Sequence, residues 1–368
     1  MEQHNRIFGL DLFRAAAIFM VVIANSLYLF QMQITSIGQF AAITGFLGLE
    51  MFFVLSGYML GKYFYPVFME PGFGWKNAGG FLKRKLLPIF ILYLLVVIMN
   101  YIIAWFADYP VNDGWKYFLL IQNFSKPIPM FFPESWGLPV IIFGVLMFVL
   151  LLSGLSKIIS QKQKQAVFPI ATIGLILVFI WTKWLYNDTT ANTNVNQWEV
   201  SLRTVAIYRF DSVFIGVLIS WLFHPDGTFC KKAKWVLALV GCGIVGFFIV
   251  GVGYLQLLIE THKVFWNIFY LPLASIGLGC FLPLLSQWES AAVFLQKPIR
   301  FLSRISYSVF LLHFSVLLLT EEFLFNLNSS GTKLVVLSLI YVLFAFLSGT
   351  ILYYLAEKPM RKRFGQLI

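Results

Sequence analysis

The chain has 368 residues, of which 60% are hydrophobic and only 12% are charged. Its mean hydropathy of +0.82 is typical of a polytopic membrane protein and excludes an ordinary soluble domain. A formal net charge of +11 is compatible with nucleic-acid binding, but the basic residues lie between apolar segments. The membrane accounts for them better, so we expect membrane lipids and no nucleic acid as partners.

Ten apolar segments, separated by short polar stretches, each have the length of a membrane-spanning helix. No interval between them is long enough for a separate soluble domain. We therefore predict an all-α, polytopic membrane protein of about ten helices, with a single transmembrane domain over residues 1–368. The predicted segments are 9–31, 44–66, 86–107, 136–153, 167–186, 207–223, 235–255, 264–286, 304–325 and 333–356.

The lysines and arginines are distributed unevenly between the loops that these segments define. With a cytoplasmic N-terminus, nineteen of them lie in cytoplasmic loops and five in external loops. Cytoplasmic loops carry such an excess in membrane proteins. The asymmetry predicts that both termini are cytoplasmic in a multi-pass protein of the inner (plasma) membrane. The cytoplasmic group includes Lys83, Arg84 and Lys85, which on this basis alone could simply anchor the topology.

The first segment carries two polar side chains, Arg14 and Asn25. Eleven helical residues complete three turns to within about 20°, so both side chains lie on one face, about 16 Å apart along the axis. An arginine at the centre of a bilayer costs about 2.5–3.5 kcal/mol on insertion scales. We interpret this face as a buried polar path. Alternatively, Arg14 extends to the headgroups and Asn25 bonds to a neighbouring helix.

Further ionisable residues lie in other segments. Glu50 is near the outer end of the second, Arg209 and Asp211 start the sixth, and His313 is about nine residues into the ninth. A single buried histidine is commonly an ordinary helix contact. Several charges of both signs must face one another or water, and such groups usually mark a path for substrate or protons.

Six short motifs follow one another along nearly the whole chain. They are Gly9-Leu10-Asp11-Leu12-Phe13-Arg14-Ala15, Gly48 to Tyr58, Lys83-Arg84-Lys85 with Pro88, Trp136-Gly137-Leu138, Arg209-Phe210-Asp211-Ser212 through Gly216, and Ser306-Tyr307-Ser308 to His313 followed by Glu357-Lys358-Pro359. In this order they resemble the signatures of the acyltransferase-3 family, polytopic enzymes that O-acylate cell-surface carbohydrates and other exported molecules. Each motif alone is weak, but the ordered set is specific.

The resemblance implies an integral membrane O-acyltransferase. Its donor would be cytoplasmic acyl-CoA, most simply acetyl-CoA, and its acceptor a hydroxyl of a carbohydrate or another exported molecule. Arginine suits bidentate contact with the phosphates of CoA. The implied roles are catalytic for Asn25, Arg14 and Glu50, donor-binding for Arg14, Lys83, Arg84 and Lys85, and acceptor-binding or orienting for Trp136, Arg209, Asp211 and His313. No metal is expected, because the three cysteines lack metal-ligand spacing.

Asn25 departs from the family pattern, which has the catalytic histidine at this position. An imidazole with a reference pKa of about 6.5 accepts a proton near neutral pH, whereas an amide does not. General-base catalysis is typically worth about 10²–10⁴-fold. We therefore expect an impaired transferase whose activity Asn25→His creates or restores, unless His313 is the base. A natural loss and a deliberate inactivating substitution both fit Asn25.

Two other classes of function remain open. A transporter also holds charges within the membrane, and paired broken helices in two repeated halves would favour it. A non-catalytic membrane sensor or scaffold built on the same fold would make Asn25 the natural residue.

Overall fold

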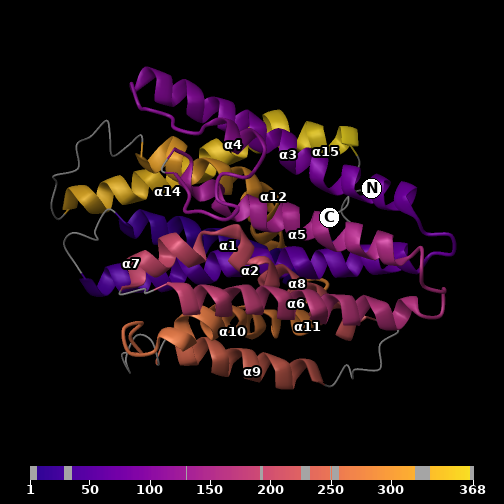
Figure 1. The fold of residues 1–368 in the computed structure, drawn as a ribbon. Helices are drawn as coiled ribbons and strands as arrows, with labels where there is room; N and C mark the ends of the chain where they lie inside the picture. The colour runs from indigo at the N-terminus through magenta and orange to yellow at the C-terminus, as the bar shows by residue number, and fades with distance from the viewer. Residues whose placement is uncertain are drawn as a thin grey trace.

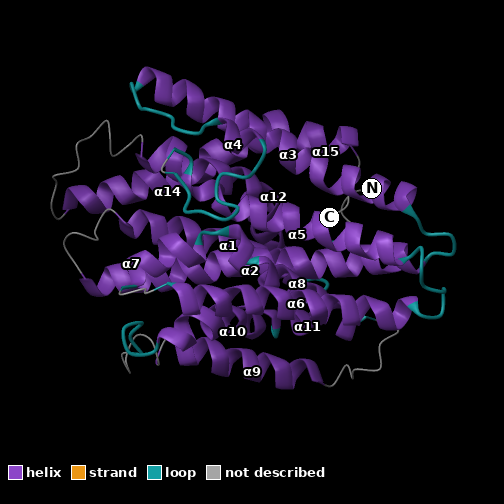
Figure 2. Cartoon of the chain, in the orientation of Figure 1, coloured by secondary structure: helices purple, strands orange, loops and turns teal. Residues whose placement is uncertain are grey.

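The computed structural model describes residues 6–28, 35–129, 131–190, 194–224, 233–248, 250, 257–319 and 332–364. It is 81% helical, and the described residues form no strand (Figure 2). The prediction of an all-α membrane protein is confirmed. In chain order the helices, with short 3₁₀ or π turns marked η, are α1 (Phe8–Tyr28), α2 (Thr35–Met69), α3 (Trp75–Phe106), α4 (Trp115–Phe118), η1 (Pro133–Trp136), α5 (Gly137–Leu155), α6 (Lys164–Thr189), α7 (Val195–Trp198), η2 (Glu199–Arg203), η3 (Ala206–Tyr208), α8 (Phe210–Leu222), α9 (Ala233–Phe247), η5 (Phe265–Phe269), α10 (Tyr270–Gly279), α11 (Leu282–Leu285), α12 (Val293–Leu312), η6 (His313–Leu319), α14 (Thr332–Leu352), η7 (Tyr353–Glu357) and α15 (Lys358–Phe364).

Each of the ten predicted segments contains a helix. Within the described residues, eight helices are long and apolar enough to cross a membrane. The pair Val195–Arg203 and Ala206–Leu222, bent by 94°, gives a ninth if it counts as one span, and α9 is a shorter apolar helix. Parts of three predicted segments lie outside the described residues, namely 29–31, 320–325, and 249 with 251–255. The loop residues Cys230, Lys231 and Lys232 also lie outside them.

Three helices begin nine or more residues before the apolar segments that predicted them. α2, α3 and α12 start at Thr35, Trp75 and Val293, because polar residues at a membrane surface end an apolar window without ending a helix. Glu50, predicted near the outer end of its segment, lies six residues after the start of the apolar span Thr44–Met69, although α2 itself begins earlier. The Lys83–Lys85 cluster, expected to precede a span, lies within α3.

Helix α2 lies at the centre of the bundle (Figure 1) and contacts α1, α5, α8 and α10. Its closest contact is with α8, where a Cβ at Gly57 would overlap the Val213 carbonyl and a Cβ at Gly216 would overlap the Val54 carbonyl. Membrane helices pack closely through such small residues. The two glycines therefore set the distance at which α2 and α8 hold their polar side chains.

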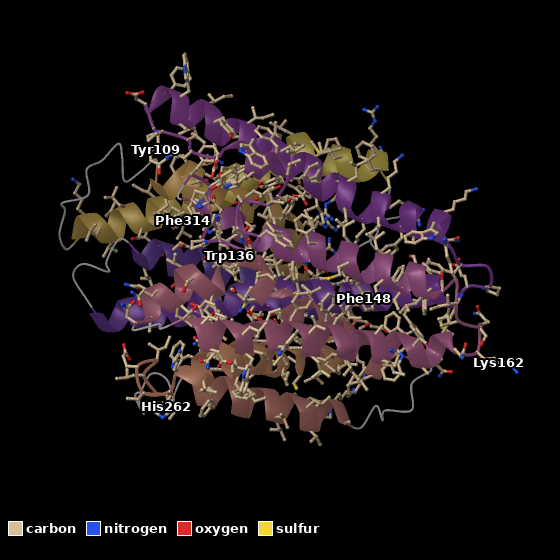
Figure 3. All side chains as sticks on the ribbon, viewed as in Figure 1. Tyr109, Trp136, Phe148, Lys162, His262 and Phe314 are labelled. Atoms are coloured by element: carbon tan, nitrogen blue, oxygen red, sulfur yellow. The ribbon has the colours of Figure 1, made fainter. Side chains whose placement is uncertain are left out.

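The loops on the two sides of the predicted topology lie at opposite ends of the bundle. Tyr109 and His262, from predicted external loops, lie at one end, and Lys162 lies at the other (Figure 3). The predicted cytoplasmic loops contact one another through Phe8 N to Glu289 O (3.2 Å), Lys164 Nζ to Glu70 O (3.1 Å) and Arg300 Nη2 to Arg6 O (3.1 Å). The alternation of helix direction matches the prediction, and the end that faces the cytoplasm stays a prediction.

Candidate active site

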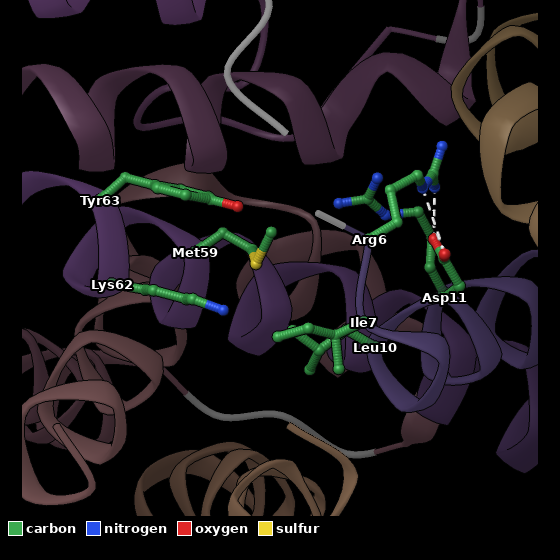
Figure 4. A pocket seen from close by; sticks show the side chains of 8 residues that line it. Arg6, Ile7, Leu10, Asp11, Met59, Lys62 and Tyr63 are labelled. Atoms are coloured by element: carbon green, nitrogen blue, oxygen red, sulfur yellow. Dashed lines mark hydrogen bonds and ion pairs between the residues drawn. The ribbon is translucent and has the colours of Figure 1, made fainter. Parts of the chain in front are cut away.

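A small pocket lies where α1 begins, at the end predicted to be cytoplasmic (Figure 4). Its volume is about 30 Å³, which is enough to hold water. α1, the two residues before it and α2 supply the lining, which consists of Arg6, Ile7, Leu10, Asp11, Arg14, Met59, Lys62 and Tyr63.

The pocket contains more positive than negative charge. The guanidinium of Arg6 donates to both carboxylate oxygens of Asp11 and, at 3.0 Å, to Ser303 Oγ. Ser303 Oγ in turn donates to Asp11 at 2.7 Å, so the single carboxylate of the pocket is engaged. Arg14 is half-buried and forms no hydrogen bond or ion pair with any residue that the structure describes. It is therefore a cation held in place without a bound anion.

The predicted basic cluster is divided by the structure. Lys85 is half-buried, with its ammonium 5.5 Å from the centre of the Tyr63 ring, and it is an electrostatic neighbour of Arg14. Lys83 and Arg84 are exposed on α3. Only Lys85 is brought to the pocket, and the other two lie where a topology anchor is expected.

Near the other end of α1, Asn25 contacts His313 of η6. Asn25 Nδ2 donates to Val21 O at 2.9 Å and lies 3.2 Å from His313 Nε2. His313 Nδ1 is 2.7 Å from Phe310 O. A carbonyl can only accept, so Nδ1 carries the hydrogen and Nε2 of the neutral ring holds a lone pair toward the Asn25 amide. The structure thus places a ring nitrogen with a lone pair beside the position where the family pattern has its histidine.

This pair can perform general-base chemistry. His313 is only 1% exposed, and its ring stacks on Phe310 with the centroids 5.7 Å apart. The contact between Asn25 and the imidazole is 3.2 Å, at the long end of the usual range for a hydrogen bond, so a hydroxyl that reached Nε2 could replace it. Such a hydroxyl would then lie between a proton acceptor, Nε2, and a donor, the Asn25 amide.

Glu50, Arg209 and Asp211 are brought together in a different place. Arg209 pairs with Glu50, and Lys183 Nζ of α6 lies 2.5 Å from Asp211 Oδ2. Glu50 also accepts from Ser275 of α10. We call Glu50, Lys183, Arg209, Asp211 and Ser275 the central cluster. All five side chains are fully buried, and the two cations balance the two carboxylates.

Trp136 lies at the same end of the bundle as His313. Its ring packs edge-on against Phe53, with centroids 5.4 Å apart, and the Arg203 guanidinium lies 5.6 Å from its centre. Figure 3 shows Trp136 and Phe314, which follows His313, in the same half of the molecule. The neighbouring Glu134 is buried and accepts from Ser315.

The six sequence motifs do not include Glu134, Lys183, Arg203 or Ser275. Glu134 could have been noticed, because it is an acidic residue two positions before Trp136. Lys183 lies within the predicted span 167–186, but nothing in its own segment indicates that Asp211 is its partner. In the part of the chain that the structure describes, no group of three or more His, Cys, Asp or Glu residues could hold a metal ion.

Comparison with known proteins identifies the family. The model of an acyltransferase domain, that of the acyltransferase-3 family, matches residues 7–357. The chain belongs to the acyltransferase-3 family. No curated protein and no solved structure matches it significantly. The family and the apolar helices together make the chain a multi-pass membrane acyltransferase.

Proposed function

We propose that this acyltransferase moves an acyl group, acetyl in the simplest case, from cytoplasmic acyl-CoA to a hydroxyl of a carbohydrate or another exported acceptor. The membrane would be the plasma membrane. One observation carries the proposal: α1 holds an unpaired cation, Arg14, near one end and contacts the lone pair of His313 near the other.

The donor fits this arrangement in two respects. Its phosphates need cations, and the pocket offers Arg14 and Lys62, with Lys85 nearby, against a carboxylate that is already engaged. Arg14 and Asn25 are separated by about 16 Å along the helix axis. CoA likewise separates its phosphates from its thioester by a long extended arm. Phosphates at the mouth of the pocket would let that arm run along α1 toward His313.

In the proposed reaction, the acceptor hydroxyl donates to His313 Nε2 in place of the Asn25 amide. The acceptor oxygen forms the ester bond to the acyl carbon as its proton passes to Nε2. The thioester C–S bond then breaks, and the CoA sulfur takes the proton from the imidazolium. The Asn25 amide, released from Nε2, can donate to the carbonyl oxygen as it gains charge, and one such donor is worth about 10²–10³-fold.

The other groups have supporting roles in this proposal. The acceptor would enter beside Trp136, where Arg203 also lies over the Phe46 ring at 5.5 Å. Phe46 belongs to the stretch of α2 that packs against α1 near Asn25. Because the central cluster is fully buried and charge-balanced, we propose that Glu50, Arg209 and Asp211 hold helices together and do not touch the acceptor.

The alternative functions predict different structures and different effects of substitution. A transporter should show broken helices in corresponding positions of two halves, whereas the described residues contain one sharply bent pair. An impaired enzyme should gain from Asn25→His, and a sensor or scaffold should bind the donor without turnover.

The test is acceptor-dependent release of CoA from acetyl-CoA in inverted membrane vesicles of the native cell, which contain the acceptor. With His313 as the base, the natural chain is active and His313→Gln lowers kcat by about 10²–10⁴-fold. If Asn25 has silenced the enzyme, the natural chain is inactive and Asn25→His raises the rate by a similar factor. Binding of acetyl-CoA with no turnover in any of the three proteins would favour the sensor or scaffold.

A further inference from the structure

Glu134 is a buried carboxylate that reaches the helix carrying His313. It lies in η1, and it is 7% exposed. Its Oε1 accepts from Ser315 twice, from the backbone amide at 2.9 Å and from the hydroxyl at 2.7 Å. Its Oε2 is buried without a hydrogen-bond partner among the described residues. A buried carboxylate that accepts a backbone N–H of a helix in the membrane needs an explanation, because N–H groups there normally bond within the helix.

The same turn sets the state of His313. Ser315 follows His313 by two residues in the π-helical segment η6. Phe310 O, one turn earlier, accepts from the His313 ring. In an α-helix this carbonyl would accept the backbone N–H of Phe314, and in a π-helix it would accept that of Ser315. The Ser315 N–H donates to Glu134 and the Phe314 N–H also interacts with that carboxylate, so Glu134 competes with both intrahelical bonds and leaves Phe310 O accessible to His313 Nδ1.

Glu134 is itself anchored from the outer loop. Pro133 begins η1, and Ser135 Oγ donates to Phe132 O at 2.6 Å while accepting from Gln122 Nε2 at 3.1 Å. These hydrogen bonds hold the turn that carries Glu134. The Glu134 carboxylate therefore has a fixed position against η6.

We infer that Glu134 is a positioning residue that selects the tautomer of His313. By holding the Ser315 amide, it directs the His313 Nδ1–H to Phe310 O and turns the Nε2 lone pair toward Asn25. The catalytic importance of this tautomer rests on the proposed function, in which Nε2 is the base. The tautomer itself can be measured whether or not the protein transfers acyl groups.

The experiment uses the full-length protein in detergent with ¹⁵N-labelled histidine, whose protonated and bare ring nitrogens resonate far apart. The chain has four histidines, and the His313→Gln spectrum assigns the signal of interest. We expect neutral His313 with hydrogen on Nδ1 in the natural protein and in Glu134→Gln, which keeps an oxygen for the Ser315 amide. In Glu134→Ala we expect hydrogen on Nε2 in a substantial fraction of molecules.

Two matched controls separate positioning from loss of structure. Ser315→Ala keeps the backbone donor and should leave the tautomer unchanged. Gln122→Ala breaks a hydrogen bond of the same buried turn without touching η6 and should also leave it unchanged. If Glu134→Ala does not fold, Glu134→Asp, whose shorter side chain withdraws the oxygens from Ser315, replaces it.

Activity provides the second readout. Glu134→Ala should lower kcat by about 10²-fold, the usual effect of a misplaced catalytic group, with KM for acetyl-CoA unchanged. Glu134→Gln should retain most of the activity.

An unchanged tautomer in both Glu134→Ala and Glu134→Asp overturns the inference. Loss of activity in Glu134→Gln with the tautomer intact also overturns it, because the charge would then matter. A tautomer shift in a protein without transferase activity sustains the inference and refutes the proposed function.

Discussion

The central cluster and the α1 pocket both hold charged side chains inside the bundle, but they differ in how the charges are balanced. In the central cluster, Glu50 pairs with Arg209 and Asp211 with Lys183, all fully buried. In the pocket, Asp11 is engaged by Arg6 and Ser303, and Arg14 forms no hydrogen bond or ion pair with a described residue, because Asp11 and Glu357 attract it only from a distance.

The difference indicates what each region is for. Buried charges that neutralise one another fix the helices from which they come, even though Arg209 Nε and Nη1 and Asp211 Oδ1 have no hydrogen-bond partner among the described residues. A half-buried cation without a partner is poorly compensated by the protein and gains when an anion arrives. Charge within a membrane span therefore marks a binding site only when the protein itself does not neutralise it.

The largest effect should come from breaking the central cluster. Arg209→Leu leaves the Glu50 carboxylate buried and unpaired, which should lower the free energy of unfolding by about 3–5 kcal/mol. Thermal unfolding in detergent, followed by tryptophan fluorescence, measures the loss.

The double variant Glu50→Leu/Arg209→Leu removes both charges and should recover most of the stability and activity, because an apolar pair of similar volume replaces a buried ion pair at little cost. A double variant that is stable but inactive would show instead that these residues act in catalysis or acceptor binding, as the family resemblance implies.

Much of the fold could be predicted from the sequence, because span positions depend on local hydropathy. Pairing between helices could not, because the period of a helix shows which residues share a face but not which helix that face meets. The shared face of Arg14 and Asn25 was predictable, whereas the contact of Asn25 with His313, 288 residues away, was not. The buried partnership of Lys183 and Asp211 was missed for the same reason.

A smaller effect, on binding only, is expected at the pocket. Arg14→Gln should weaken acetyl-CoA binding by about 10- to 100-fold, since a hydrogen bond to a charged group contributes about 1.5–3 kcal/mol. The unfolding temperature should not fall, because no described residue pairs with Arg14. Isothermal titration in detergent gives Kd.

The contrast with the central cluster fails if Arg14→Gln unfolds the protein while binding by the folded fraction is unchanged. Arg14 would then be a structural cation, and the donor phosphates would need another site.

The smallest expected effect concerns acetyl-CoA binding by two lysines of the basic motif in α3. Lys85 and Lys83 lie on the same helix two residues apart, but Lys85 is half-buried beside Tyr63 and near Arg14, whereas Lys83 is exposed. Lys85→Gln should weaken acetyl-CoA binding about two- to fivefold, in line with the small energies of partly exposed ion pairs. Lys83→Gln should leave Kd unchanged. The loss of affinity in Lys85→Gln should shrink as salt is raised from about 0.05 to about 0.5 M, because the Debye length then falls well below 10 Å. Equal effects of the two substitutions would mean that the whole basic motif attracts the donor by its net charge, and that the pocket around Arg14 does not select among these lysines.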